Sequence, residues 1–235
     1  MTELIKPYFI GIAGESGVGK TTMANAMAFF LGEEKTLIIS TDDLHKWERT
    51  SSMWNQFTHS DPRANNLDLG DWQMAALAKG EAIYRSRYNH DIGHFSPPHK
   101  LAPLPYIINE GLHAFFSDKT NSVMDLRIFV DTNDDLRIHW KILRDTVARG
   151  YNREQVMLAI AKRRADDALI RDVQLKRADV IVRLTSDIAS PGNSSEDSKL
   201  AVEISFKEGK RVQEDMLDFV GRSLTGKPAV LLAHT

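Results

Sequence analysis

Short runs of apolar residues recur along this chain, and between them apolar residues return every three or four positions. The short runs predict strands at residues 8–13, 36–40, 106–109, 126–131 and 179–184. Strands that alternate with helices are typical of an α/β fold. We therefore expect a mainly parallel sheet that is flanked by helices.

The helical periodicity is found at residues 21–31, 72–79 and 134–149. The second of these lies between Asp71 and Gly80, which are typical helix-capping residues. In the third, Gly150 follows where a left-handed C-terminal cap is expected. Its apolar side chains form one stripe, which we expect to face the core: Leu136, Trp140, Leu143 and Val147.

The second half of the chain becomes more polar. Residues 152–176 keep helical periodicity but are heavily charged, which predicts an exposed helical pair that acts as a lid. Residues 185–198 are rich in Ser, Asp, Gly and Asn and are expected to form a flexible loop. An alternating strand around Val202 and a helix over 210–221 follow. We expect all of residues 1–235 to form one domain.

Composition removes several classes of function. The 30 Lys and Arg residues nearly balance the 32 Asp and Glu residues, so the formal net charge of -2 provides no general attraction to nucleic acid or membrane lipid. The chain has no Cys, which excludes disulfides and thiolate metal sites. We see no signal peptide and no apolar run of membrane-spanning length. We expect a cytoplasmic homodimer that binds a small-molecule substrate.

The segment after the first strand matches the P-loop pattern G-x-x-x-x-G-K-[ST]. Its glycines let backbone N–H groups converge on phosphate oxygens, and the helix that follows adds its positive N-terminus. Lys20 would supply a cation to the transferring phosphate, and Thr21 would ligate Mg²⁺. The residues expected to bind ATP are Gly14, Ser16, Gly17, Val18, Gly19, Lys20, Thr21 and Thr22.

Acidic residues follow two other predicted strands. Asp42 and Asp43 come at the carboxyl end of the second strand, and Glu110 follows the third. The carboxyl ends of parallel strands are where open α/β sheets bind ligands. Either aspartate could be a general base for phosphoryl transfer, or could instead cap a helix or bind magnesium. Asp42, Glu110 and Thr21 form the expected magnesium site.

Two further patterns leave alternatives open. Lys141, Arg144 and Asp145 share one helix face, which would suit a bound anion or a solvated ion pair. His90, His94 and His99 have a spacing that zinc sites use, but Gly93 and the pair of prolines at 97 and 98 break any helix there. No N-K-x-D sequence is present, which argues against a GTPase.

With these residues assembled, the chain resembles the phosphoribulokinase and uridine kinase family. Within that family it is most similar to the enzymes of photosynthetic organisms, over residues from about 10 to 184. The segments that carry the resemblance are DDLHKWER at 42–49, DPRANNLDL at 61–69, YNHDIG at 88–93, INEGLH at 108–113 and WKILRDTVARG at 140–150.

The resemblance implies an ATP- and Mg²⁺-dependent kinase that phosphorylates a hydroxyl of ribulose 5-phosphate or a related phosphorylated sugar or polyol. It implies that Asp42 is the catalytic base, with Lys20 and Arg144 stabilising the developing charge. It also implies a set of residues that bind the phosphates of the substrate or the nucleotide: His45, Arg49, Tyr88, His90, His113, Lys141, Arg144 and Arg149.

The chain departs from the photosynthetic enzymes at several positions. Ser52 stands where a second arginine is usual, and Ile170 and Val173 replace an aromatic residue and a proline in the lid. The cysteines and the long carboxyl-terminal part of those enzymes have no counterpart here. Two alternatives therefore stay open: a uridine or cytidine kinase, and a nucleotide-binding regulator without catalytic activity.

Overall fold

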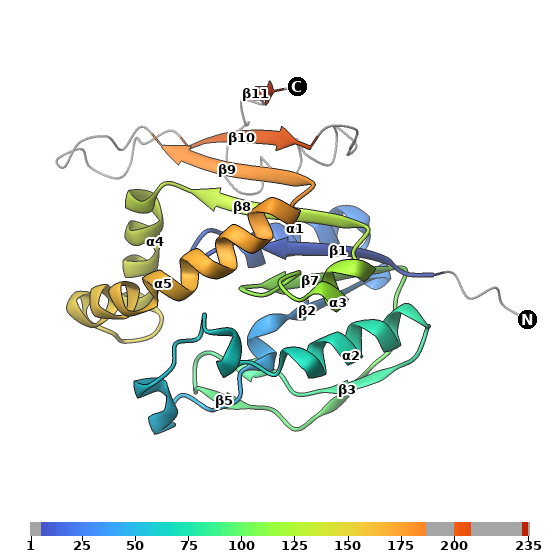
Figure 1. Cartoon of the computed structure of the whole chain (residues 1–235), viewed down its shortest axis with the longest axis horizontal. Coiled ribbons are helices and arrows are strands. Elements are labelled where there is room, and N and C mark those ends of the chain that lie inside the picture. The colour runs from blue at the N-terminus through green and yellow to red at the C-terminus, as the bar shows by residue number, and fades with distance from the viewer. Residues whose placement is uncertain (1–5, 187–199, 208–231, 235) are drawn as a thin grey trace, which may run out of the picture.

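A seven-stranded sheet forms the centre of the molecule. The computed structural model describes residues 6–186, 200–207 and 232–234. The strand order is β11-β10-β9-β8-β1-β7-β2. Figure 1 shows this sheet running across the structure, with helices in front of it and behind it. The strands are β1 (Tyr8–Ala13), β2 (Thr36–Ser40), β7 (Tyr106–Gly111), β8 (Leu126–Thr132), β9 (Val180–Ser186), β10 (Leu200–Phe206) and β11 (Leu232–His234).

The sheet is mainly parallel, as predicted. Strands β2, β7, β1, β8 and β9 run in one direction, and β10 pairs with β9 in the antiparallel sense. Successive residues of β1 point to opposite faces, and both sets are buried: Ile10 and Ile12 pack with one cluster, Phe9 and Ala13 with the other. This double burial explains why the strand is a continuous apolar run.

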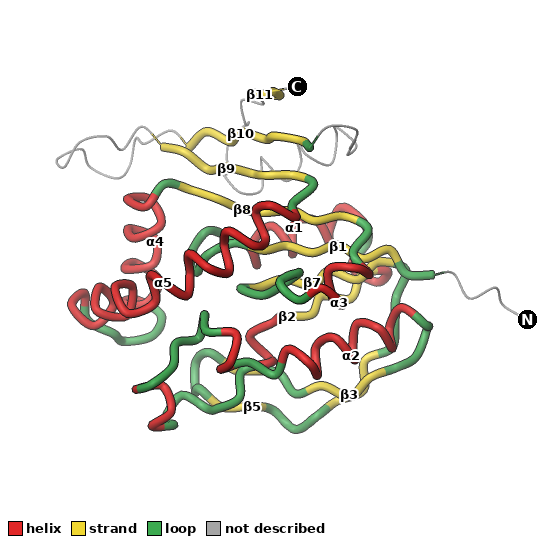
Figure 2. Tube along the Cα trace, in the orientation of Figure 1, coloured by secondary structure: helices red, strands yellow, loops and turns green. Residues whose placement is uncertain are grey.

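Five helices of the described residues cover the two faces: α1 (Lys20–Leu31), α2 (Leu67–Ala78), α3 (Asp118–Val123), α4 (Asp134–Val147) and α5 (Arg153–Arg177). Met23 and Met27 of α1 pack into one core cluster. Met74 of α2 and Leu175 of α5 pack into the other. In Figure 2, α5 and α3 cross the front of the sheet and α1 lies behind it.

The segments between β2 and β7 contain short elements that the sequence pattern did not predict. They are β3 (Ile83–Arg85) paired with β6 (His99–Leu101), and β4 (Tyr88–Asn89) paired with β5 (His94–Phe95). Tight helical turns at η2 (Thr41–Leu44), η3 (Ser52–Asn55) and η4 (Pro62–Ala64) lie before α2. Strands of two or three residues are too short to show a periodic pattern.

The predicted helix at residues 72–79 begins earlier than expected, at Leu67. Asp71 is therefore not a cap. Its carboxylate accepts hydrogen bonds from the hydroxyl of Thr120, at 2.7 Å, and from the hydroxyl of Ser117. Because the apolar pattern predicts the start of this helix five residues too late, an acid inside the helix was predicted as its cap.

The expected core stripe of α4 was wrong for its second half. Leu136 is buried, but Leu143 is 55% exposed and Val147 is 78% exposed. The polar face of the helix is buried instead, including Lys141 and Asp145. The helix has turned this face toward the P-loop, so its charged side chains are taken up by ion pairs rather than by water.

The predicted lid is one 25-residue helix, α5, rather than a helical pair. Asn152 begins it with a capping box that it forms with Gln155. Residues 187–198 of the predicted loop and the predicted helix at 210–221 lie outside the described residues. Within the described ranges, no helix has both the length and the apolar composition that a membrane span requires.

Candidate active site

The register of the sheet brings three loops together at one edge. Ala13 of β1 pairs with Gly111 of β7, and Ser40 of β2 pairs with Glu110. The P-loop begins at the residue after Ala13, and Asp42 follows two residues after Ser40. The phosphate-binding loop and both predicted acids therefore meet at the carboxyl ends of adjacent parallel strands.

The P-loop glycines occupy positions that a side chain could not. Gly14 has φ +152°, and a Cβ placed there would lie 2.3 Å from the carbonyl oxygen of Val130. Gly17 has φ +95°, and its Cβ would lie 3.3 Å from Cβ of Lys141. The second contact packs α4 directly against the loop. The loop backbone is held close to the cationic face of α4, as a phosphate cradle requires.

Lys20 is the first residue of α1, and its Nζ donates a hydrogen bond of 2.8 Å to the carbonyl oxygen of Glu15. Burial lowers the pKa of Lys20, against the raising influence of Glu110 and Asp42. Glu15 in turn forms an ion pair with Arg137, with 2.7 Å between Oε2 and Nε. This ion pair fixes the start of the loop to α4.

The three residues predicted to hold magnesium lie around this loop. The Thr21 hydroxyl donates to Oε2 of Glu110 at 3.4 Å. Burial and the nearby Asp42 carboxylate raise the pKa of Glu110. A divalent cation held by these residues would offset the negative charge of both carboxylates. Hydroxyl and carboxylate oxygens are the donors that Mg²⁺ prefers, so the residues present fit that ion.

The structure separates the roles of the two neighbouring aspartates. Oδ2 of Asp42 lies 2.9 Å from Nε2 of His90. Burial alone would raise the pKa of Asp42, but the hydrogen bond to His90 and the charges of His45 and Lys20 hold it well below its usual range. Asp42 is therefore an ionised acceptor that faces the site.

Asp43 has a structural part. Its Oδ1 accepts a 2.8 Å hydrogen bond from the backbone N–H of Tyr88, and its Oδ2 lies 3.3 Å from Nε of Arg85. Arg85 is buried and also donates to the amide of Gln73 and to the carbonyl oxygen of Ser40. Asp43 thus ties β3 and β4 to the end of β2, which orients the neighbouring Asp42.

Several of the predicted acceptor residues, among them His45, Tyr88 and His90, lie beside Asp42. We call them the acceptor wall. His45 is buried, and its Nδ1 lies 2.7 Å from Oδ1 of Asn65. Tyr88 packs edge-on to His45 with 5.4 Å between the rings. Arg49 donates to the carbonyl oxygens of His90 and of Asp91, the latter at 3.3 Å. The loop that carries His90 is therefore held in place by Arg49.

His113 lies deeper than the other predicted acceptor residues. It is buried, and its Nε2 lies 3.0 Å from the carbonyl oxygen of Ser60. Burial lowers its pKa to about 4, although the hydrogen bond to Ser60 opposes that shift. In this structure His113 supports the segment before Asp61. Its contact with a substrate stays a prediction.

The cationic face of α4 converges on one carboxylate. Asp145 lies 2.8 Å from Nζ of Lys141, 2.9 Å from Arg144 and 3.2 Å from Arg149. Arg144 also donates to the hydroxyl of Ser16 in the P-loop, at 3.3 Å. Three cations share one acid, so this face keeps a net positive charge. An anion could therefore bind there even though Lys141 and Asp145 form an ion pair.

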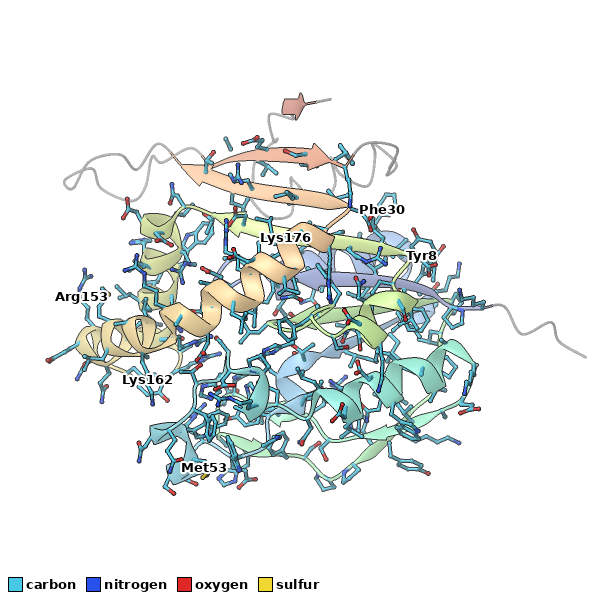
Figure 3. All side chains as sticks on the ribbon, viewed as in Figure 1. Tyr8, Phe30, Met53, Arg153, Lys162 and Lys176 are labelled. Atoms are coloured by element: carbon cyan, nitrogen blue, oxygen red, sulfur yellow. The ribbon has the colours of Figure 1, made fainter. Side chains whose placement is uncertain are left out.

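Helix α5, the predicted lid, contacts the segment at residues 54–60 through hydrogen bonds that the sequence pattern did not predict. Arg163 donates to the Ser60 hydroxyl at 2.8 Å, and Ser60 donates to Asp167. Lys162 Nζ donates to the carbonyl oxygen of Trp54 at 2.6 Å. Figure 3 shows Lys162 on the side of α5 that faces the segment carrying Met53. We call these contacts the lid latch.

The sequence feature that corresponds to this latch is the charge run at residues 162–164. Such a run predicts an exposed helix face, and the structure differs at Arg163. Only 12% of the Arg163 side chain is exposed. Arg163 also influences the pKa values of Lys20 and His45, so its charge reaches the site. Sequence periodicity could not show this, because the partner segment lies more than a hundred residues earlier.

The histidine pattern forms no zinc site. Nδ1 of His94 lies 2.7 Å from Glu48, whereas His90 faces Asp42. Among the residues that the structure describes, no group of three or more histidines and acids could hold a metal ion.

Comparisons with known proteins agree with this arrangement. Residues 9–190 match the model of the "Phosphoribulokinase / Uridine kinase family". The phosphoribulokinase of Synechocystis sp. is 34% identical over 183 residues, which cover 78% of this chain and 55% of that protein. The uridine kinase of Halalkalibacterium halodurans is 31% identical over 155 residues, covering 65% of this chain and 74% of that enzyme.

Solved structures support the fold. The phosphoribulokinase from Rhodobacter spheroides superposes with a TM-score of 0.66 at 19% identity, covering 90% of this chain and 84% of that one. The chain spans about half the length of the curated phosphoribulokinases that it matches, 55% and 59% in two of them. The family model nevertheless covers most of the chain. This protein therefore belongs to the phosphoribulokinase and uridine kinase family.

Proposed function

We propose that this protein is an ATP-dependent kinase that transfers the γ-phosphoryl group to a hydroxyl of a sugar phosphate, either ribulose 5-phosphate or a related phosphorylated sugar or polyol. The observation that carries the proposal is the ionised Asp42 carboxylate beside His90, at the same sheet edge as the P-loop and Glu110. One side of that edge suits a phosphate donor, and the other suits an acceptor hydroxyl. The similarity to phosphoribulokinases supports the choice of acceptor.

In this proposal Asp42 accepts the proton of the acceptor hydroxyl as that oxygen attacks the γ-phosphorus atom. The bond from this phosphorus to the oxygen that bridges the β- and γ-phosphates breaks, and ADP leaves. Transfer by a positioned base contributes about 10² to 10⁴ in rate. His90 keeps Asp42 ionised and oriented until the acceptor arrives. Lys20 and Arg144 provide positive charge beside the P-loop, where negative charge develops on the transferring group.

Thr21, Glu110 and Asp42 would hold magnesium. When bound, that ion neutralises phosphate charge and orients the phosphate oxygens. The phosphate group of the acceptor would bind to two cations on the acceptor side of the site, Arg49 and Arg149. The homodimer, the single domain and the cytoplasmic location remain parts of the same proposal.

The deciding experiment measures ADP release with a panel of acceptors: D-ribulose 5-phosphate, D-ribose 5-phosphate, uridine and cytidine. We expect a sugar phosphate to have the highest kcat/KM. Asp42→Asn should lower turnover at least about a hundredfold, because an amide cannot accept the proton. ATP binding should persist, because the P-loop, Thr21 and Glu110 are unchanged.

Asp68→Asn, an exposed acid on α2, is the matched control and should keep wild-type turnover. If Asp42→Asn turns over at the wild-type rate, Asp42 is not the base. ATP binding without phosphorylation of any acceptor in the panel would favour the non-catalytic regulator.

One observation favours a second candidate, a uridine or cytidine kinase. Aromatic rings lie on the acceptor side of the site, including the stacked pair Trp54 and His59, and aromatic rings suit a planar nucleobase. A uridine kinase is also among the similar proteins. A kcat/KM for uridine or cytidine above that for both sugar phosphates would establish this candidate instead.

A further inference from the structure

A pair of stacked rings lies on the acceptor side of the site, outside the set of residues predicted from the sequence. Trp54 and His59 are 4.0 Å apart and nearly parallel, with an interplanar angle of 10°. Trp54 is itself fixed, because its Nε1 donates a 2.9 Å hydrogen bond to the carbonyl oxygen of Glu48. Trp47 packs edge-on against it at 5.2 Å. The plane of the His59 ring is therefore set by its neighbours.

A row of rings connects His59 to the proposed base. His59 lies 4.8 Å from His45, and His45 lies 5.4 Å from Tyr88. Tyr88 in turn lies 5.0 Å from His90, which contacts Asp42. His59 therefore borders the same acceptor wall as the residues around Asp42.

Each of the other histidines of this wall contacts another protein group through one ring nitrogen. His45 faces Asn65, His90 faces Asp42 and His113 faces the carbonyl oxygen of Ser60. Within residues 6–186, 200–207 and 232–234, by contrast, no protein group hydrogen-bonds either ring nitrogen of His59. Its ring is only partly exposed. A neutral imidazole offers one donor and one acceptor to a ligand.

The charge of His59 suits a hydroxyl better than a phosphate. Burial lowers its pKa to about 3, and the positive charges of His45 and Arg163 act in the same direction. The ring is therefore neutral near pH 7. Phosphate groups are bound in proteins mainly by charged donors such as arginine and lysine. Of those donors, Arg163 is engaged by Ser60 and Asp167, and the others lie elsewhere in the site, on Arg49 and on the cationic face of α4.

We propose that His59, held by Trp54, hydrogen-bonds a hydroxyl of the acceptor next to the reacting one and so selects the acceptor by its stereochemistry. The proposal rests on the proposed sugar-phosphate kinase function. The ligand class is a polyhydroxylated sugar phosphate, and His59 is a specificity-determining residue with no part in the proton transfer. A site that hydrogen-bonds a hydroxyl rejects an analogue that misplaces it, because a buried polar group is then left without a partner.

The test compares D-ribulose 5-phosphate with D-xylulose 5-phosphate, which differ only in the configuration of one hydroxyl. We expect the wild-type kcat/KM values to differ at least about tenfold. His59→Phe keeps a ring to stack on Trp54 but removes both nitrogen atoms. It should reduce the ratio of the two kcat/KM values at least about tenfold and leave the KM for ATP within about twofold.

Two further variants separate hydrogen bonding from packing. His59→Gln restores one donor and one acceptor, so it should keep the ratio closer to the wild-type value than His59→Phe does. His139→Phe makes the same substitution at an exposed position on α4 and should change nothing. The melting temperature of each variant shows whether it is folded.

The possible failures can be told apart. If the wild-type protein phosphorylates neither sugar phosphate, the proposed function fails and this inference with it. If it phosphorylates one of them but does not discriminate, or if His59→Phe keeps the wild-type ratio, this inference is overturned and the proposed function stands. An equal loss of kcat/KM for both epimers would make His59 a structural residue and would also overturn the inference.

Discussion

Lys141 is a cation of the site whose charge depends on pH. Its side chain is buried against the P-loop at Gly17 and lies 2.8 Å from Asp145. Burial lowers its pKa to about 8, and the charge of Arg163 acts in the same direction, whereas Asp145 opposes the shift. The ammonium group is therefore charged below about pH 8 and neutral above it. Arginine at the same position would stay charged throughout.

This titration should appear in the pH dependence of phosphorylation. We expect kcat/KM for the sugar phosphate to fall as the pH rises through about 8, because the free enzyme then loses one positive charge. In Lys141→Arg the decline at about pH 8 should be absent, because a guanidinium group stays charged. Initial rates at low acceptor concentration measure it. A decline above pH 8 that persists unchanged in Lys141→Arg would assign the titration to another group.

At the scale of elements, the lid helix and the acceptor segment behave as one packed unit. Arg163 and Asp167, one turn apart on α5, both contact the hydroxyl of Ser60. Asp166 accepts a 2.7 Å hydrogen bond from Thr58 on the same segment. His59 lies between these two anchored residues. These contacts therefore connect α5 directly to the segment that carries His59.

Asp167→Asn should open this latch. The substitution removes the negative charge that lies 3.7 Å from Arg163, and the remaining buried cation is destabilising. We expect faster tryptic cleavage at residues 162–164 and a fall in kcat/KM for the acceptor of about tenfold, larger than the change for ATP. Timed digestion and steady-state kinetics measure the two effects.

The matched control for the latch is Asp172→Asn, because Asp172 lies on the same helix with 67% of its side chain exposed. It should behave as the wild type, since exposed ion pairs contribute little. Equal digestion rates for Asp167→Asn and Asp172→Asn would show that the latch does not hold the lid.

At the scale of the whole molecule, buried histidines connect the site to the stability of the fold. The pKa of His113 is lowered by burial from 6.5 to about 4. As the pH falls below 6.5, His113 becomes protonated in the unfolded chain, whereas it stays neutral in the folded protein. The stability conferred by this residue is present in full above that pH and is lost progressively toward pH 4.

We therefore expect the free energy of unfolding to fall on acidification by up to about 1.4 kcal/mol per pH unit from His113. His113→Gln keeps a donor for the carbonyl oxygen of Ser60 but does not titrate, so its slope between pH 6.5 and 5 should be smaller. Urea unfolding at several pH values measures the slopes. His139→Gln, at an exposed position, is the control, and identical slopes for all three proteins would contradict the prediction.

The sequence alone was enough to predict the parallel sheet, the P-loop and the family. These features depend on local patterns: apolar runs for strands buried on both faces, and glycines with a lysine between a strand and a helix. Asp42 and Glu110 were predictable because the ends of parallel strands meet at one edge. The five strands predicted at 8–13, 36–40, 106–109, 126–131 and 179–184 are all present, within two residues at their ends.

The folded structure was needed to show which face of α4 is buried, that residues 153–177 form one helix, and what that helix contacts. Leu143 is exposed and Lys141 is buried, the reverse of what the apolar pattern predicts. The reason is that the P-loop, more than a hundred residues away in the sequence, covers the polar face of α4. Ser60 and Arg163 likewise meet because two segments that lie more than a hundred residues apart in the sequence pack together. Periodicity reports only how residues are spaced along one element, whereas burial depends on which distant segment packs against it.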